Sequence, residues 1–319
     1  MKKTLYKRFI SIVLASAMSS VLITGCGSSE NGSSSGSESK ITIGVSMKDN
    51  SDEFVKRISN AMTAKGKELG VKVMMNDAGG DVNQQISDVE TMIAQGVNAL
   101  IVNPQDIEGS APTVSMANEA GIPIIIVNGD IADENYTGFV GSTDQEAGEM
   151  LGKWFMENLP KGSNVCILEG PMGQSGQVGR MNGFKEVGML DYFNVLDTQT
   201  ANWKRDQAMT LAENWITKYG DKLDAIICEN DDMGMGALSA AKAAGRDDIL
   251  IGGVDGIDDA LEGVKDGTYG VSIVQDAIGQ GEKSIELAVK AAKGEKIEYD
   301  TRIPFKICTK DNVDDFLNG

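Results

Sequence analysis

The feature that most constrains the fold is a regular alternation of short Val/Ile-rich runs with segments of helical period, which begins at residue 41. In one such segment, 82–95, the residues Val82, Ile86 and Val89 recur on a single helical face. The intervening runs are apolar throughout. Because such strands are buried on both faces, the pattern predicts an α/β protein with parallel sheets covered by helices.

The expected elements form two successive α/β units, because the same rhythm restarts after about residue 140. Strands are expected at 41–46, 71–76, 99–103, 123–128, 136–140, 165–169, 193–196, 225–230, 249–255, 271–275 and 302–305. Helices are expected at 53–69, 82–95, 205–219 and 278–293, with others ending at 120 and 244 and one starting near 177.

The two units repeat one another. NALIVN (98–103) parallels DAIICEN (224–230), and GIPIIIVN (121–128) parallels DILIGGVD (248–255). Each run ends in Asn or Asp at the carboxyl end of a strand, which is the edge where open parallel sheets bind ligands. We therefore expect four side chains to face a shared cleft: Asn103, Asn128, Asn230 and Asp255.

The last segments of the chain add an element to each unit, so the chain is expected to cross between the units more than once. The predicted architecture is two Rossmann-like domains joined by a hinge of several crossings. The N-terminal lobe is assigned to 41–141 plus 276–300, and the C-terminal lobe to 142–275 plus 301–319.

The first 25 residues are predicted to be a signal peptide, because a basic start at Lys2 and Lys3 precedes an apolar stretch too short for a good membrane span. The end of this stretch, ITGC (23–26), resembles the lipobox of bacterial lipoproteins. The resemblance implies lipidation of Cys26, followed by a Ser/Gly-rich tether at 26–40. We expect an extracytoplasmic protein anchored to the bacterial cell membrane; a soluble secreted protein is the alternative.

Composition removes several classes of function. The chain has no histidine, which excludes Ser-His and Cys-His dyads and HExxH metal sites. Its net charge of −18 disfavours nucleic acid as a partner. The cysteines Cys166, Cys228 and Cys308 have no zinc-like spacing and are expected to be buried free thiols.

Eight sequence blocks occur in an order that resembles one family. They are ITIGVSMKDNSDEF, VMMNDAGGDVNQQISDVETMIAQGVNALIVNPQD, IPIIIVN, VGSTDQEAG, NWKRDQA, ENDDMGMGALSAAKAAG, GGVDGIDDALEGVKDGTYGVSIVQDA and IPFKICTKDNVDDF. The resemblance, over about 41–316, is to the monosaccharide-binding periplasmic proteins of ABC importers, of the galactose/glucose-, ribose- and inositol-binding type. It implies the type I periplasmic binding protein fold and no enzymatic activity.

A sugar site needs carboxylates and amides for hydroxyl groups and aromatic rings for C–H faces. The resemblance assigns ligand contacts to eight residues, namely Asp52, Phe54, Asn128, Arg180, Trp203, Asn230, Asp255 and Gln275. Lys48 and Gln174 are secondary candidates: with Gly176, they replace a tyrosine, a histidine and an aspartate of the galactose/glucose binder. These departures leave inositol, ribose or another pentose or polyol open beside the favoured galactose-like hexose.

Each assignment has a structural alternative. Asp52, Asn230 and Asp255 are also suited to capping the helices that follow them. Phe54 could be a core residue of its helix, and Trp203, at the start of a helix, could cap its domain. Asn128 and Gln275 could be polar loop ends, and Arg180 half of a surface ion pair.

In the stretch ENDD (229–232), only Asn230 is expected to reach the ligand. Glu229 is expected to face away, and Asp231 and Asp232 to serve the first turn of the following helix. A metal site is disfavoured here, and LPKGSNVC (159–166) lacks the spacing of a calcium loop.

The leading hypothesis is a lipid-anchored receptor that closes on a monosaccharide or cyclic polyol and delivers it to ABC transporter permease subunits. We expect no cofactor, metal or nucleic acid. The protein is expected to be a monomer. The competing classes are a carboxylate glycosidase using Asp52 and Asp255, and a sugar-responsive repressor, which would need a helix-turn-helix where the signal peptide stands. A chemosensory role alongside transport stays open.

Overall fold

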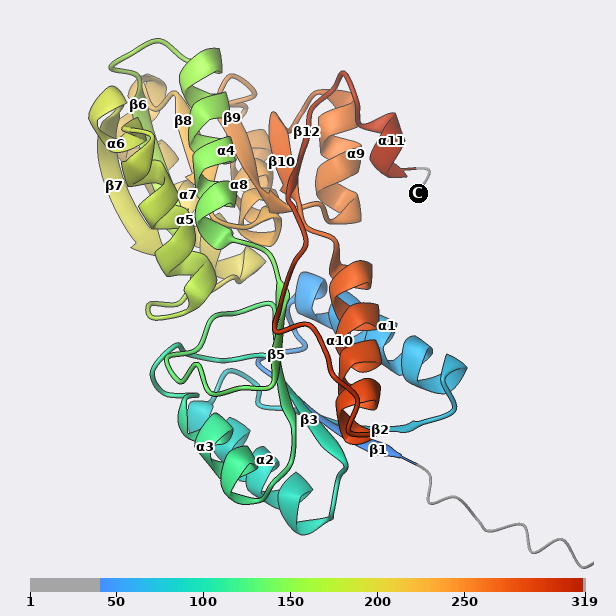
Figure 1. The fold of residues 1–319 in the computed structure, drawn as a ribbon. Coiled ribbons are helices and arrows are strands. Elements are labelled where there is room, and N and C mark those ends of the chain that lie inside the picture. Colours follow the sequence, from blue (N-terminus) through green and yellow to red (C-terminus); the bar gives the residue numbers. More distant parts are fainter. Residues whose placement is uncertain (1–40, 318–319) are drawn as a thin grey trace, which may run out of the picture. The chain divides into compact units, whose positions relative to one another are not determined.

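The computed structural model describes residues 41–317. The predicted signal peptide (1–25), the lipidation site Cys26 and the tether 26–40 lie outside the described residues. Within 41–317 the chain forms two six-stranded sheets, each flanked by helices (Figure 1), which confirms the α/β prediction. No helix in this range is long and apolar enough to cross a membrane.

The first lobe is built on a fully parallel sheet with the order β11-β5-β4-β3-β1-β2. Its strands are β1 (Thr42–Met47), β2 (Lys72–Asp77), β3 (Ala99–Val102), β4 (Ile124–Val127), β5 (Gly138–Gly141) and β11 (Asp300–Arg302). Its helices are α1 (Glu53–Glu68), α2 (Val82–Ala94), α3 (Pro112–Glu119) and α10 (Ala277–Ala292). One apolar core lies under α1 and α10, and another under α2 and α3.

The second lobe repeats this plan with the order β12-β10-β9-β8-β6-β7, in which only β12 runs antiparallel among the described strands. Its strands are β6 (Asn164–Glu169), β7 (Asn194–Thr200), β8 (Ala225–Cys228), β9 (Leu250–Asp255), β10 (Val271–Val274) and β12 (Lys306–Cys308). Its helices are α4 (Asp144–Asn158), α5 (Ser175–Glu186), α6 (Met189–Tyr192), α7 (Arg205–Tyr219), α8 (Asp231–Ala243), α9 (Asp258–Asp266) and α11 (Asp314–Leu317), with a 3-10 turn at Gly220–Lys222.

Three connections join the lobes: 142–143 after β5, 275–276 after β10, and 303–305 after β11. The predicted strand at 302–305 is wrong in its position. Arg302 ends a strand of the first sheet and Lys306 begins a strand of the second. The residues between them pass from one sheet to the other, and Pro304 has no N–H to donate to a ladder.

Strand-to-helix turns are set by capping side chains. Asp52, Asp81, Asn230 and Asp276 each accept a hydrogen bond from the backbone at the start of the next helix. These caps fix the helix starts beside the carboxyl ends of the strands, so the same turns place polar side chains at the edge where a ligand binds.

The three cysteines of the described chain are buried free thiols, as predicted. Burial raises the pKa of Cys166 to about 12 and that of Cys308 to about 11. Both thiols are therefore protonated and inert at neutral pH.

Helices α4 and α5 approach each other at glycines. A Cβ at Gly148 would lie 2.1 Å from the carbonyl oxygen of Arg180. We expect Gly148→Ala to lower the free energy of unfolding by about 1–3 kcal/mol, because the two backbones must separate. The control is Lys153→Ala, an exposed change on the same helix that removes only a surface ion pair with Glu149. Equal thermal midpoints for the two variants would contradict this packing.

Candidate ligand-binding site

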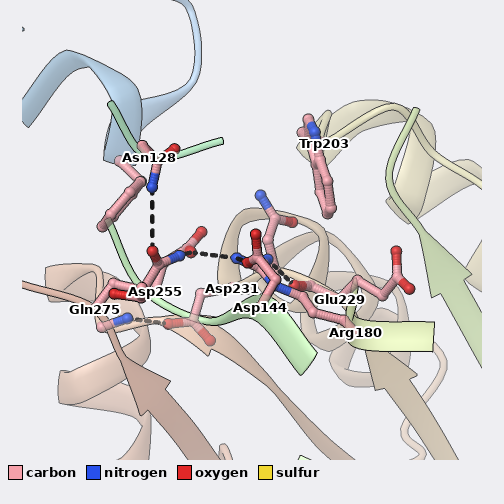
Figure 2. Close-up of polar contacts among 12 residues, drawn as sticks. Asn128, Asp144, Arg180, Trp203, Glu229, Asp231, Asp255 and Gln275 are labelled. Atoms are coloured by element: carbon pink, nitrogen blue, oxygen red, sulfur yellow. Dashed lines mark hydrogen bonds and ion pairs between the residues drawn. The ribbon is translucent and has the colours of Figure 1, made fainter. Parts of the chain in front are cut away.

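A cavity at the carboxyl ends of the strands is lined by both lobes and encloses about 320 Å³, part of it continuous with solvent. We call it the inner cavity. Its walls contain nine of the ten predicted contact residues. Figure 2 shows five of them: Asn128, Arg180, Trp203, Asp255 and Gln275. The lining residues are Lys48, Asp52, Phe54, Asn128, Asp144, Ser175, Gly176, Arg180, Trp203, Asn230, Asp255 and Gln275.

Arg180 is the buried cation of the site, with 5% of its surface exposed. Its guanidinium donates to the backbone oxygen of Glu229 and to Asp144 Oδ1 at 3.2 Å, and lies 3.7 Å from Asp255 Oδ1. Burial opposes its charge, but the nearby carboxylates outweigh burial and raise the pKa of Arg180. Its Nε atom has no hydrogen-bond partner within residues 41–317. Arg180 is thus a fixed cation with one donor left for a ligand.

Asp255 is the last residue of β9 and has a φ of 130°, a backbone conformation that residues other than glycine seldom adopt. Gln275 Nε2 donates to its Oδ1 at 2.8 Å. Burial raises the pKa of Asp255 well above its ordinary value, against the opposing effect of Arg180. Strained backbone and a buried carboxylate at one position are typical of a functional site.

Asp52 has two roles. Its Oδ1 accepts from the backbone N–H groups of Phe54 at 2.9 Å and Val55 at 3.2 Å, and so caps α1. The same side chain lines the inner cavity. Burial raises its pKa, while the charge of Lys48 opposes that shift. The capping role therefore holds and leaves the second carboxylate oxygen for another donor.

Asn230 follows the same plan in the second lobe. Its Oδ1 caps α8 by accepting from Met233 N at 2.9 Å. Its amide nitrogen is buried and has no partner in the described part of the chain. A buried donor without an acceptor costs about 1–3 kcal/mol, which a ligand hydroxyl at this position would recover.

Two aromatic rings border the cavity. Phe54 is 4% exposed and belongs to the core under α1, so it serves both the core and the cavity wall. Trp203, at φ 61°, lies over Gly170, where a Cβ would come within 2.0 Å of the ring. Its indole N–H donates to Gln174 Oε1 at 2.7 Å, which fixes the ring plane.

A chain of amides links the lobes across the second connection (Figure 2). Asn128, at φ 65°, donates from Nδ2 to Gln275 Oε1 at 3.2 Å and to Gln280 Oε1 at 3.0 Å. Gln275 in turn donates to Asp255. These hydrogen bonds thus connect Asn128 of the first lobe, through Gln275, to Asp255 of the second.

Asp231 does not line the inner cavity but holds the backbone next to Asp255. Its carboxylate is fully buried and accepts from Gly256 N at 2.8 Å, Tyr269 Oη at 3.1 Å and Ser272 Oγ. Asp231 thus holds the turn that follows Asp255. The prediction that its carboxylate serves the first turn of its own helix is wrong. The neighbouring Asp232 pairs with Arg205 at 2.8 Å.

Some residues lie elsewhere than expected. Asn103 does not line the cavity; it is fully buried and donates to the backbone oxygen of Val127 at 3.0 Å. Gln174 holds Trp203 and borders a neighbouring cavity. Asp144 and Ser175 line the inner cavity although sequence reasoning did not select them. Asp144 stood in the block VGSTDQEAG, where a first-turn acid suggests no more than helix stabilisation.

Comparison with known proteins agrees with this geometry. Residues 43–296 match the family described as periplasmic binding protein domain. The xylitol-binding protein of Mycolicibacterium smegmatis is 34% identical over 307 residues, covering 96% of this chain and 86% of the relative. The ribose import binding protein of Bacillus subtilis is 31% identical over 308 residues, covering 95% and 99%.

A solved structure is equally similar. It is an ABC transporter solute binding protein from Bacillus halodurans with bound myo-inositol, which is 35% identical with a TM-score of 0.83. The match covers 88% of this chain and 98% of that one.

Two lobes with a polar cavity between their strand ends suit a protein that binds a ligand. The relatives named above are binding proteins of transport systems, not enzymes. The chain belongs to the periplasmic binding protein family, which confirms the resemblance seen in the sequence.

The buried Asp231 makes stability depend on pH. Burial raises its pKa from 3.8 to about 6, so at intermediate pH the folded state holds a proton that the unfolded state has lost. The contribution of the protonated Asp231 to the free energy of unfolding is complete below about pH 4 and is lost as the pH rises through about 6. We expect the free energy of unfolding of the wild type minus that of Asp231→Asn to fall over this range, measured by urea unfolding.

The control is Asp232→Asn, the same chemical change at a partly exposed neighbour. It should cost less stability than Asp231→Asn, because water can replace its ion pair. A wild-type minus Asp231→Asn difference that is flat from pH 4 to 7 would contradict the assignment.

Proposed function

We propose that the protein captures a neutral sugar or polyol in the inner cavity and delivers it to an ABC importer. The observation that carries the proposal is the composition of this cavity. Asp52 and Asp255 line the cavity with carboxylates. Arg180 and Asn230 line it too, and each has a buried donor without a hydrogen-bond partner in the described residues. Because hydroxyl groups both donate and accept, a polyhydroxylated ring can satisfy all four, while Phe54 and Trp203 cover its C–H faces.

Within this class, a polyol or pentose fits better than the galactose-like hexose that the sequence favoured. The relatives named above bind xylitol, ribose or myo-inositol according to their names. Lys48 and Gly176 give this cavity an ammonium where the galactose/glucose binder has a phenol, and no side chain where it has a carboxylate. We therefore place myo-inositol, xylitol and ribose ahead of galactose and glucose.

We also propose that the protein works outside the cytoplasm, anchored through Cys26 as a monomer. The location and the lipid anchor rest on the N-terminal sequence alone. A globomycin-sensitive shift in the mass of the protein, absent in Cys26→Ala, would support the lipid anchor.

A thermal-shift panel tests the ligand class. We expect saturating myo-inositol, xylitol or ribose to raise the melting temperature, because a ligand that binds only the folded state stabilises it. Ligand at about 100 times its Kd adds about 2.7 kcal/mol. If none of these three, nor galactose or glucose, shifts the midpoint, the class is wrong.

Variants of the cavity wall test the site itself. Trp203→Ala and Asp255→Asn should abolish the shift and still unfold cooperatively. The matched control is Asp266→Asn, an exposed carboxylate at the end of α9 that should retain the full shift. Retained binding in both cavity variants would refute the site.

An ion pair that joins the two lobes should slow ligand release. Lys204 Nζ in the second lobe lies 2.7 Å from Asp49 Oδ2 in the first and also contacts Ser51. Because the pair is partly exposed, we expect Lys204→Ala to speed dissociation about two- to fivefold, measured by stopped-flow tryptophan fluorescence. Lys218→Ala, on the outer surface of the same lobe, is the control. An unchanged rate at low salt would show that the pair does not restrain opening.

A further inference from the structure

A second cavity adjoins the first on the far side of Asp52 and Trp203. It encloses about 600 Å³, part of it continuous with solvent, and we call it the outer cavity. It is formed by the turns after β1, β2 and β3 of the first lobe and after β6 and β7 of the second. Its lining residues are Lys48, Asp49, Asp52, Gly79, Gly80, Gln105, Pro171, Gln174, Asn202, Trp203 and Lys204.

The two cavities share walls. Lys48, Asp52 and Trp203 line both of them. These three side chains therefore stand between the cavities, and a substituent on a ring held in the inner cavity would enter the outer cavity by passing between them. The ion pair of Lys204 with Asp49 lies on the wall of the outer cavity, where it joins the two lobes.

The outer cavity contains polar groups that the protein leaves without partners. Gln105 Oε1 is buried and accepts no hydrogen bond in the described structure. The ammonium of Lys48 has no hydrogen bond or ion pair to any described residue. Gln174 uses its Oε1 for Trp203, and its amide nitrogen has no partner between residues 41 and 317. One acceptor and two donors without protein partners thus belong to residues that line this cavity, which is the mixture that a hydroxylated group requires.

Charge and shape narrow the class of group that fits. Two lysines and two aspartates balance in the wall, so the cavity offers no net attraction to an anion such as a phosphate. Most of its lining residues are polar, and Trp203 and Pro171 add apolar surface, which together suit a group that carries both hydroxyls and C–H faces. Gly79 and Gly80, at φ 59° and 85°, form a turn that other residues rarely adopt, and a Cβ at Gly79 would meet no atom within 4 Å. The absence of side chains there keeps the cavity wide.

We propose that the outer cavity is a second subsite, which receives a hydroxylated substituent carried by the ligand in the inner cavity. The protein then takes glycosylated polyols or disaccharides as well as single rings. This inference rests on the proposed function of the inner cavity, and it adds the size class of the ligand.

Calorimetric titration of two matched pairs tests the subsite. The pairs are myo-inositol with galactinol, its galactosyl derivative, and galactose with melibiose, a disaccharide that contains it. We expect the glycoside of at least one pair to bind no more weakly than its parent ring. A site for a single ring would instead exclude the second unit and weaken binding by more than about 100-fold.

A variant separates the subsite from general stability. Gln105→Ala removes the unpartnered acceptor and should weaken the glycoside about tenfold, the equivalent of one hydrogen bond, with the parent ring unchanged. Gln145→Ala, an exposed glutamine on α4, is the control and should change neither.

The outcomes distinguish the two proposals. If no parent ring and no glycoside binds, the proposed function fails, and the subsite with it. If a parent ring binds but both glycosides are excluded, the subsite alone is refuted. A Gln105→Ala variant that weakens the parent ring and the glycoside equally, or neither of them, also overturns it.

Discussion

The site depends on the compensation of one buried positive charge. Arg180 lies in the interior of the second lobe, where an isolated guanidinium would be strongly unfavourable. Its partners come from α4, from the end of β8 and from the end of β9, in Asp144, the Glu229 backbone and Asp255. Because breaking a buried pair costs several kcal/mol, these elements keep one relative position, and the cavity wall that they form is rigid before a ligand arrives.

At two helix starts a single side chain has two roles. Asp52 and Asn230 each use one oxygen to cap a helix and direct the rest of the side chain to the cavity. Capping and ligand binding are therefore not competing explanations at these positions. A side chain that is already fixed by its own helix loses little further conformational entropy when it binds a hydroxyl group. Positive φ angles at Asn128, Trp203 and Asp255 show that the backbone is also held in unusual conformations where ligand contacts are expected.

The two cavities differ in their lining residues and in their volume. The inner cavity has buried donors, carboxylates and two aromatic rings, which suit a single polyhydroxylated ring. The outer cavity has more free volume, is lined mostly by polar residues whose charges balance, and shares Lys48, Asp52 and Trp203 with the inner cavity. Lys204 and Asp49 join the lobes at the outer cavity, whereas Asn128 and Gln275 join them at the second connection.

The alternation of strands and helices, the repeat of two lobes and the polar residues at the strand ends can all be predicted from the sequence, because periodicity and capping are local properties. The sequence could not place 302–305, whose residues are shared between two sheets, nor show that Asn103 turns inward while Asn128 lines the cavity. Both follow strands with the same apolar pattern. Only the tertiary structure decided between them, as it decided that Asp144 compensates Arg180 and that Asp231 holds the turn after Asp255, because these contacts join residues 25 to 36 positions apart.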